Sequence, residues 1–148
     1  MNQAQKQVML RRRGGVIDIV LDTDTFNEVD DQYALSYLLH SEDRLRLRAI
    51  YAAPFANEKA ATPREGMEKS YDEILHILKL NGRSDLNEIV YRGSTRYLPD
   101  EKTPVISPAA EDMVERSRDY DAQNPLVIVA IGAITNVASA ILLDPTIL

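Results

Sequence analysis

The segment from Val16 to Leu35, which reads VIDIVLDTDTFNEVDDQYAL, decides the fold. Its first six residues are rich in β-branched side chains and predict a buried strand over residues 16–21. From Asp30 to His40 the apolar residues recur at helical spacing and predict a helix. A strand that leads into a helix through a run of acidic residues is typical of the beginning of a βαβ unit.

The rest of the chain continues this alternation. The sequence predicts further strands over residues 45–52, 89–91 and 126–131 and further helices over 63–80, 107–120 and 135–143. The second helix has the clearest boundaries, because a capping box at Thr62–Glu65 precedes it and Asn81-Gly82 follows it. We therefore expect an α/β fold with a largely parallel, mixed sheet flanked by helices. A polar N-terminal arm over residues 1–15, with Arg11 to Arg13, precedes this domain at 16–148.

Composition excludes several classes of protein. The chain has 148 residues, is 45% hydrophobic and carries a formal net charge of -6. An acidic protein without a basic face is a poor ligand for nucleic acid. The chain has no cysteine, which excludes disulfides and thiolate metal ligands and suits a reducing cytoplasm. The longest apolar run covers about half of a membrane span, so we expect a cytoplasmic protein that binds neither nucleic acid nor membrane.

Four aspartates, Asp22, Asp24, Asp30 and Asp31, fall within ten residues at the carboxyl end of the first predicted strand. Taken singly, each is more often a turn or helix-start residue than a functional one. As a set they destabilise the fold, because two ionised carboxylates about 4 Å apart repel by roughly 4 kcal/mol. A helix N-terminus offsets only about 0.3–1 kcal/mol of this repulsion per charge. The cluster therefore predicts either protonated carboxyl groups or a bound cation, and its oxygen donors suit Ca²⁺ or Mg²⁺.

Other motifs compete for the same residues. An EF-hand loop that began at Asp22 would need glycine and glutamate where the chain has Asn27 and Tyr33, which excludes it. Phosphatases of the haloacid dehalogenase type also begin with a strand and Asp-x-Asp, but they usually carry threonine or valine at the position of Phe26. A Mg²⁺-dependent phosphohydrolase remains an alternative, as does a non-catalytic metal-binding or assembly module. We expect Tyr33 and Tyr37 to lie in the core rather than to form a base-stacking platform.

The segment over residues 22–31 resembles the N-terminal signature of the inosine-uridine preferring nucleoside hydrolases, a strand followed by Asp-x-Asp-Pro-Gly-x-Asp-Asp. A second stretch, Val129 to Ala138, is similar to the family's strand-turn-helix segment with Gly-x-Leu-Thr-Asn-x-Ala. Weaker similarity covers residues 91–94 and the loop with Asn57. The signature is a variant, because five residues, Thr25 to Val29, replace the usual three. Family members are considerably longer, so residues 16–148 would correspond to the N-terminal half of such a domain.

The resemblance implies a Rossmann-like nucleoside hydrolase fold and a Ca²⁺-dependent hydrolysis of the N-glycosidic bond of ribonucleosides. Asp24, Asp31 and the main-chain carbonyl of Ile131 would be metal ligands. Asp24 would also be the general base that activates water, and Asp22 would lie behind the ligands and orient them.

The resemblance further implies that Asp30 accepts a hydrogen bond from a ribose hydroxyl. Asn57 would be a sugar contact, and Asn27 would enter the site from the lengthened loop. We expect a homo-oligomer that takes a small-molecule nucleoside as its substrate. Because further ligands and the leaving-group acid of the family lie beyond the matched segments, we also expect the 148-residue chain alone to bind Ca²⁺ weakly and to hydrolyse nucleosides poorly or not at all.

Overall fold

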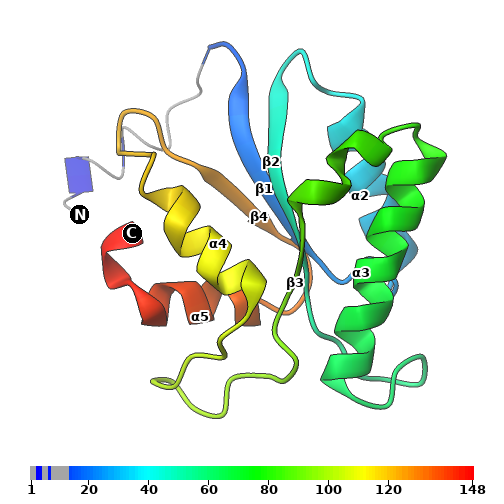
Figure 1. The fold of residues 1–148 in the computed structure, drawn as a ribbon. Coiled ribbons are helices and arrows are strands. Elements are labelled where there is room, and N and C mark those ends of the chain that lie inside the picture. The colour runs from blue at the N-terminus through cyan, green and yellow to red at the C-terminus, as the bar shows by residue number, and fades with distance from the viewer. Residues whose placement is uncertain (1–2, 5–6, 8–13) are drawn as a thin grey trace.

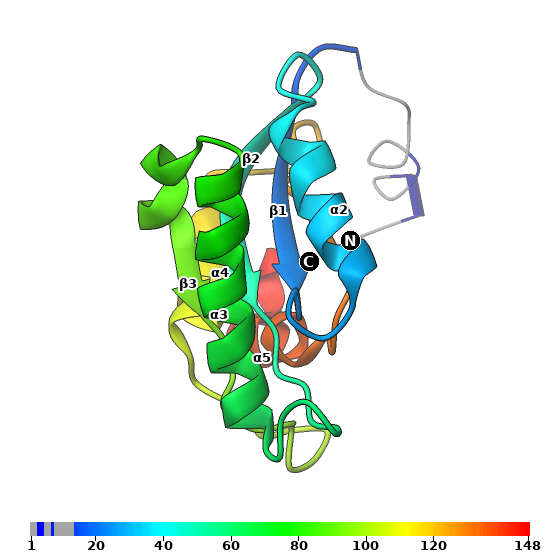
Figure 2. The ribbon, with the colours of Figure 1, turned by 90° about the vertical axis from the view of Figure 1, so that its right-hand side faces the viewer.

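The computed structural model describes residues 3–4, 7 and 14–148. Arg11 to Arg13 of the predicted N-terminal arm lie outside the described residues. Figures 1 and 2 show helices on both faces of one sheet. The strands are β1 (Ile17–Thr23), β2 (Leu45–Ala52), β3 (Val90–Arg92) and β4 (Val127–Ala130), the α-helices are α2 (Val29–Leu39), α3 (Pro63–Leu80), α4 (Pro108–Ser117) and α5 (Thr135–Leu143), and two short 3₁₀ helices are η1 (Ser84–Ile89) and η2 (Pro145–Ile147). In the described part of the chain, no helix is both long and apolar enough to cross a membrane.

The sheet has the strand order β3-β2-β1-β4, and every pairing in it is parallel. The α/β class is therefore as predicted, and the sheet is wholly parallel where a mixed one was expected. The chain moves outward from β1 to β3 through α2 and α3, and it then returns through α4 to the other side of β1. In Figure 2, α2 and α3 lie in front of the sheet, whereas α4 and α5 lie behind it. The order of strands thus reverses between β1 and β4, and in open α/β sheets ligands bind at the carboxyl ends of the strands at such a point.

Alternate side chains of β1 supply the two halves of the core. Ile19 and Leu21 belong to an apolar cluster with α2 and α3, whereas Val20 belongs to a second cluster with α4 and α5. This period of two is the ordinary geometry of a strand. Both faces of β1 are covered by helices, and its last five residues are buried. The central strand therefore delivers its carboxyl end to a place that is largely screened from water.

The predicted caps of α3 are present. The Thr62 hydroxyl accepts a hydrogen bond from the Glu65 backbone N–H at 3.2 Å, and the Glu65 side chain accepts one from the Ala61 backbone N–H at 3.0 Å. Gly82 has a φ of 69°, the left-handed conformation that ends helices. These contacts fix both ends of the longest helix, which lies against β2 and β3.

The prediction that Tyr33 and Tyr37 belong to the core is wrong. Their exposed fractions are 73% and 69%. Helix α2 is apolar around much of its circumference, and the side that meets the sheet carries Leu35, Leu38 and Leu39. At about 100° per residue, a helix that buries these leucines turns the two tyrosines outward.

A buried hydrogen-bond network attaches α4 to the sheet. The hydroxyl of the fully buried Tyr51 donates to Asp112 Oδ2 at 2.6 Å, and Arg116 forms two further hydrogen bonds with the same carboxylate, each 2.9 Å long. Removing a buried donor to a charged group costs about 1.5–3 kcal/mol. We therefore expect Tyr51→Phe to lower the free energy of unfolding by that amount in urea titrations. The exposed Tyr97 offers a control, and equal losses in Tyr51→Phe and Tyr97→Phe would contradict the assignment.

Candidate functional site

The alternation of β1 continues beyond its apolar part and sorts its polar residues onto two sides. Asp22 Oδ1 accepts a hydrogen bond from Asn136 Nδ2 of α5 at 2.8 Å. The next residue, Thr23, points to the other side, and its hydroxyl donates to Asp31 Oδ2 of α2 at 2.5 Å. The carboxyl end of the central strand is thereby joined to the first turns of the two helices that flank the reversal of strand order.

Asp22 is fully buried. Among the residues that the structure describes, its second oxygen, Oδ2, has no hydrogen-bond partner. Burial raises the pKa of Asp22 to about 7; the hydrogen bond from Asn136 opposes this shift, and the negative charge of Asp24 adds to it. Near neutral pH this carboxyl group therefore holds its proton part of the time.

Asp24 and Asp31 are neighbours, with exposed fractions of 7% and 5%, and Asp24 is also close to Asp22. Burial raises the pKa of Asp31 to about 6; the Thr23 hydrogen bond lowers it, and the charge of Asp24 raises it. Burial also raises the pKa of Asp24, against a hydrogen bond from Asn27 that lowers it. The structure therefore places three of the four predicted aspartates together, in a setting that opposes their negative charge.

Asp30 is not part of this buried group. It lies exposed at the start of α2 beside Asp31. Because its side chain is accessible to solvent, Asp30 is available to an incoming ligand in a way that Asp22 is not.

The turn between β4 and α5 passes close to Asp24. A Cβ atom on Gly132 would lie 2.8 Å from Asp24 Oδ1 and 2.9 Å from the Asp24 backbone nitrogen, distances that real Cβ atoms do not show. The Ile131 backbone N–H donates to the Asp22 carbonyl at 2.9 Å. Only glycine at position 132 therefore lets the segment with the Ile131 carbonyl approach the carboxylates.

Asn136 connects three separate segments of the chain. Its Nδ2 donates to Asp22 and, at 3.2 Å, to the Ala52 carbonyl at the end of β2, while its Oδ1 accepts from the backbone N–H and the hydroxyl of Ser94 at 2.7 and 2.8 Å. A Cβ on Gly93 would collide with both Asn136 and Ala52. Asn136 lies in the second similar segment, but no role was predicted for it from the sequence. Its buried, fully hydrogen-bonded side chain holds the orientation of Asp22.

Asn27 and Asn57, both expected at the site, are brought to Asp24. Asn27 Nδ2 donates to Asp24 Oδ2 at 3.0 Å, and Asn57 Nδ2 donates to Asn27 Oδ1 at 2.7 Å. Asn57 itself is exposed. The lengthened loop over residues 25–29 therefore folds back onto the carboxylate cluster and meets the loop that follows β2.

The donors present suit a hard cation only in part. Across residues 3–4, 7 and 14–148, no three His, Asp or Glu side chains are placed to hold one metal ion. The chain would offer the carboxylates of Asp24 and Asp31 and the Ile131 carbonyl, whereas Ca²⁺ takes six to eight oxygen ligands and Mg²⁺ keeps several waters. The raised pKa values show that burial disfavours the charged form of these carboxyl groups, and a bound cation would offset that cost. The residues thus fit a weakly held cation whose other ligands are water or substrate.

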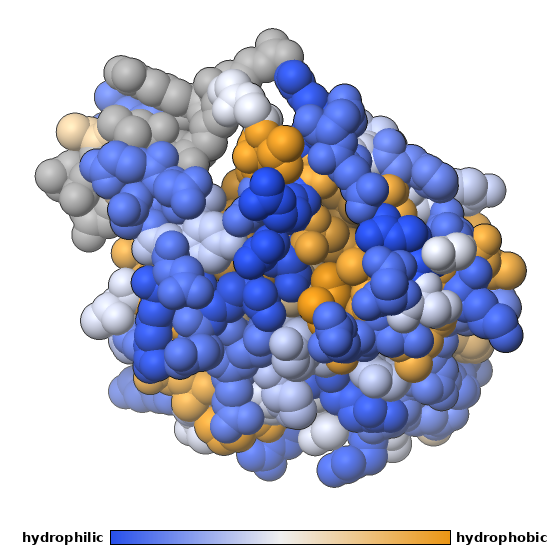
Figure 3. All heavy atoms as spheres, turned by 45° about the horizontal axis from the view of Figure 1, so that its top comes forward, coloured by the Kyte–Doolittle hydropathy of each residue, from blue (hydrophilic) through white to orange (hydrophobic). Residues whose placement is uncertain are grey.

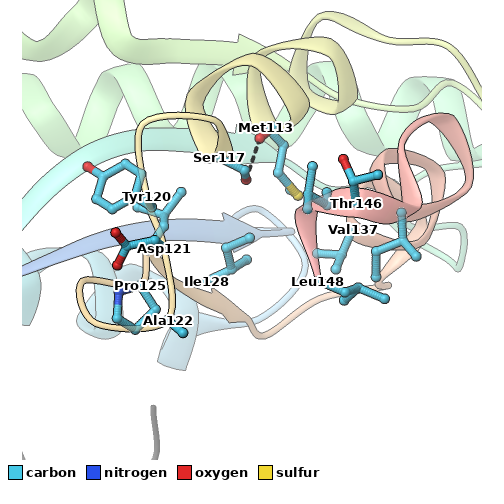
Figure 4. Close-up of a pocket in the computed structure, with 13 residues that line it drawn as sticks. Met113, Ser117, Tyr120, Asp121, Ala122, Pro125, Ile128, Val137, Thr146 and Leu148 are labelled. Carbon is cyan, nitrogen blue, oxygen red and sulfur yellow. Dashed lines mark hydrogen bonds between the residues drawn. The ribbon is translucent and has the colours of Figure 1, made fainter. Parts of the chain in front are cut away.

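Cavities in the described part of the chain lie away from this cluster. One, of about 430 Å³, lies between α4, β4 and α5, and Figure 4 shows its largely apolar lining, which includes Met113, Ile128, Val137 and Leu148. Figure 3 brings forward the edge at which the strands begin, where hydrophobic surface lies in a hollow bordered by hydrophilic residues. A cavity of about 320 Å³ with Leu45 in its wall lies there. Neither of these two cavities is lined by any of the four predicted aspartates, which lie at the opposite edge of the sheet, where the strands end.

No protein-family model, curated protein or solved structure matches this chain. The carboxylate cluster and the sequence resemblance are therefore the two features that bear on function. The geometry that bears most directly on it is the contact between residues 22–31 and residues 129–138, the two segments that carry that resemblance.

Proposed function

We propose that the chain belongs to the inosine-uridine type of nucleoside hydrolase, with the nucleoside hydrolase version of the α/β fold, and that its site cleaves the N-glycosidic bond of ribonucleosides with Ca²⁺. One observation carries the proposal: Asn136 of the second similar segment donates at 2.8 Å to Asp22 of the first. Two segments that lie more than a hundred residues apart thus build one acidic site at the reversal of strand order. A chance likeness of either segment would not require them to meet.

The site has groups suited to this reaction. A cation held by Asp24, Asp31 and the Ile131 carbonyl would supply positive charge that polarises water and the ribose diol. Asp24 would accept the proton of the attacking water, whose oxygen bonds to the anomeric carbon while the C–N bond breaks and its electron pair leaves with the base.

The transition state of this reaction develops positive charge on the sugar. The negative charges of Asp24 and Asp31 would stabilise it, and the site excludes much of the water that would screen them. The exposed Asp30 would accept a hydrogen bond from a ribose hydroxyl. The buried Asp22 would take no direct part.

The burial of Asp22 argues against the phosphohydrolase alternative. In haloacid dehalogenase phosphatases the first aspartate of Asp-x-Asp attacks the phosphoryl group. Here that residue is fully buried and hydrogen-bonded to Asn136, so a phosphoryl group cannot reach it. A non-catalytic metal-binding module would use the same residues, so only an experiment can distinguish it from a nucleoside hydrolase.

The test combines calorimetric titration of Ca²⁺ and Mg²⁺ with assays of base release from inosine and uridine and of phosphate release from p-nitrophenyl phosphate. We expect Ca²⁺ to bind weakly, with a Kd of about 0.1–1 mM, because the chain supplies only two carboxylates. We expect base release that depends on Ca²⁺ and no phosphate release. Binding without base release would support the non-catalytic module, and phosphate release would overturn the proposal.

A further inference from the structure

Three side-chain and main-chain amides form a chain of hydrogen bonds that runs in one direction and ends on Asp24. The Lys59 backbone N–H donates to Asn57 Oδ1 at 2.8 Å, Asn57 Nδ2 donates to Asn27 Oδ1 at 2.7 Å, and Asn27 Nδ2 donates to Asp24 Oδ2 at 3.0 Å. We call this series the amide relay; it consists of the Lys59 backbone N–H, the side-chain amides of Asn57 and Asn27, and the Asp24 carboxylate that accepts the last hydrogen bond. Each side-chain oxygen in the relay is occupied by the preceding donor, so each NH₂ group must face the next acceptor.

The backbone of Asn27 is held as well. Its N–H donates to the Asp24 carbonyl at 2.6 Å, and its own carbonyl accepts from Lys59 Nζ. Lys59 is in turn tied to α3, because its carbonyl accepts a hydrogen bond from Lys69 Nζ. The loop after β1 is therefore fixed to the loop after β2 through both the backbone and the side chain of one residue.

We propose that Asn27 is a positioning residue that holds the Asp24 carboxylate, and that Asn57 acts through Asn27 rather than as a sugar contact. This proposal rests on the proposed function. Asn27 occupies Asp24 Oδ2, while Gly132 lies close against Oδ1. Together they restrict the rotation of the Asp24 carboxylate.

The amide relay also accounts for the altered signature. The common form of the motif carries Pro-Gly in this loop, and neither residue has a side-chain donor. The two additional residues between Asp24 and Asp30 supply Asn27 and let its amide reach back three positions to Asp24. The longer loop therefore provides a support for the general base that the shorter loop cannot provide in this way.

The direct test uses the side-chain amide protons of Asn27, observed by nuclear magnetic resonance in the full 148-residue chain. In the wild type, one Nδ2 proton should be shifted downfield and exchange slowly with solvent. Asn57→Ala should abolish both properties although Asn57 does not touch Asp24, because Asn27 is then free to turn its amide. Asn87→Ala, on the exposed surface of η1, is the control. Unchanged Asn27 signals in Asn57→Ala would overturn the amide relay.

The functional test is a double-mutant cycle read out by Ca²⁺ affinity and by kinetics. Residues that orient a metal ligand typically affect affinity by about 10–100-fold. We expect Asn27→Ala and Asn57→Ala each to weaken Ca²⁺ binding by at least about tenfold, and the double variant to be no weaker than Asn27→Ala. In base release, kcat should fall while the KM for the nucleoside stays constant.

Two other outcomes are possible; the first bears on the positioning role of the asparagines and the second on the proposed function. If both asparagines contacted the sugar, KM would rise, Ca²⁺ affinity would hold and the two effects would add, which would overturn the positioning role. If the wild-type chain neither bound Ca²⁺ nor released base, the proposed function would fail. The amide signals of Asn27 would still decide whether Asn27 holds Asp24.

Discussion

Replacing Asp24 with asparagine is expected to lower the rate of base release by at least about 100-fold, since a general base typically contributes 10²–10⁴-fold to a rate. The same replacement should raise the melting temperature of the metal-free protein. Asp24 has an exposed fraction of only 7%, and its raised pKa means that the folded state disfavours its charge. Asparagine has the same size and no charge, and after rotation of its amide it can still pair with Asn27.

The opposite signs of the two effects make this prediction specific. Initial rates of base release at saturating Ca²⁺ and melting temperatures in EDTA measure them on one preparation. Asp72→Asn, on the exposed side of α3, is the matched control and should change neither quantity appreciably. An Asp24→Asn protein that kept more than about a tenth of the wild-type rate would remove Asp24 from its role as general base.

Local signals in the sequence predict most of the fold. The strand Leu45–Ala52 and the helix Thr135–Leu143 have the predicted bounds, and α3 begins and ends at its predicted caps. Apolar runs, capping residues and glycine turns act over a few residues, so they can be recognised in one sequence. The orientation of α2 could not be recognised in this way. With apolar residues around much of the helix, only packing against the sheet decides that Tyr33 and Tyr37 face outward.

Some features of the candidate site could likewise be predicted from the sequence, and others could not. The period of two in a strand predicts that Asp22 and Asp24 share a side, and the returning helix α2 was expected to bring both Asp30 and Asp31 back to them. Asp31 is buried there, whereas Asp30 lies exposed. Thr23 lies on the other side of the strand from Asp22, and its hydrogen bond to Asp31 was not predicted. The role of Asn136 depends on a contact across 114 positions and on the order of the strands. The order of the strands in the sheet cannot be read from any short stretch of sequence.

The second large effect concerns stability, which in the metal-free protein should fall as the pH rises from about 5 to about 7.5. Burial raises the pKa of Asp22 from 3.8 to about 7 and that of Asp31 to about 6. In this window the unfolded chain has already released these protons while the folded chain still holds them. Raising the pH therefore removes protons from the folded state alone, which destabilises it. Asp22 by itself should account for about 2–3 kcal/mol.

Urea unfolding in EDTA at both ends of the pH window measures this dependence, and comparison with Asp22→Asn isolates the part due to one carboxyl group. Carboxylates whose pKa is lowered by their partners, such as Asp85 and Asp144, titrate below the window and act in the opposite direction. Asp22→Asn should reduce the dependence of the unfolding free energy on pH and be more stable than the wild type at the upper pH.

Saturating Ca²⁺ should restore much of the lost stability to the wild type, because a bound cation neutralises the same charges and binds only the folded state. A wild-type protein that became more stable with rising pH in EDTA would show that the buried aspartates do not carry the surplus negative charge on which a cation site here depends.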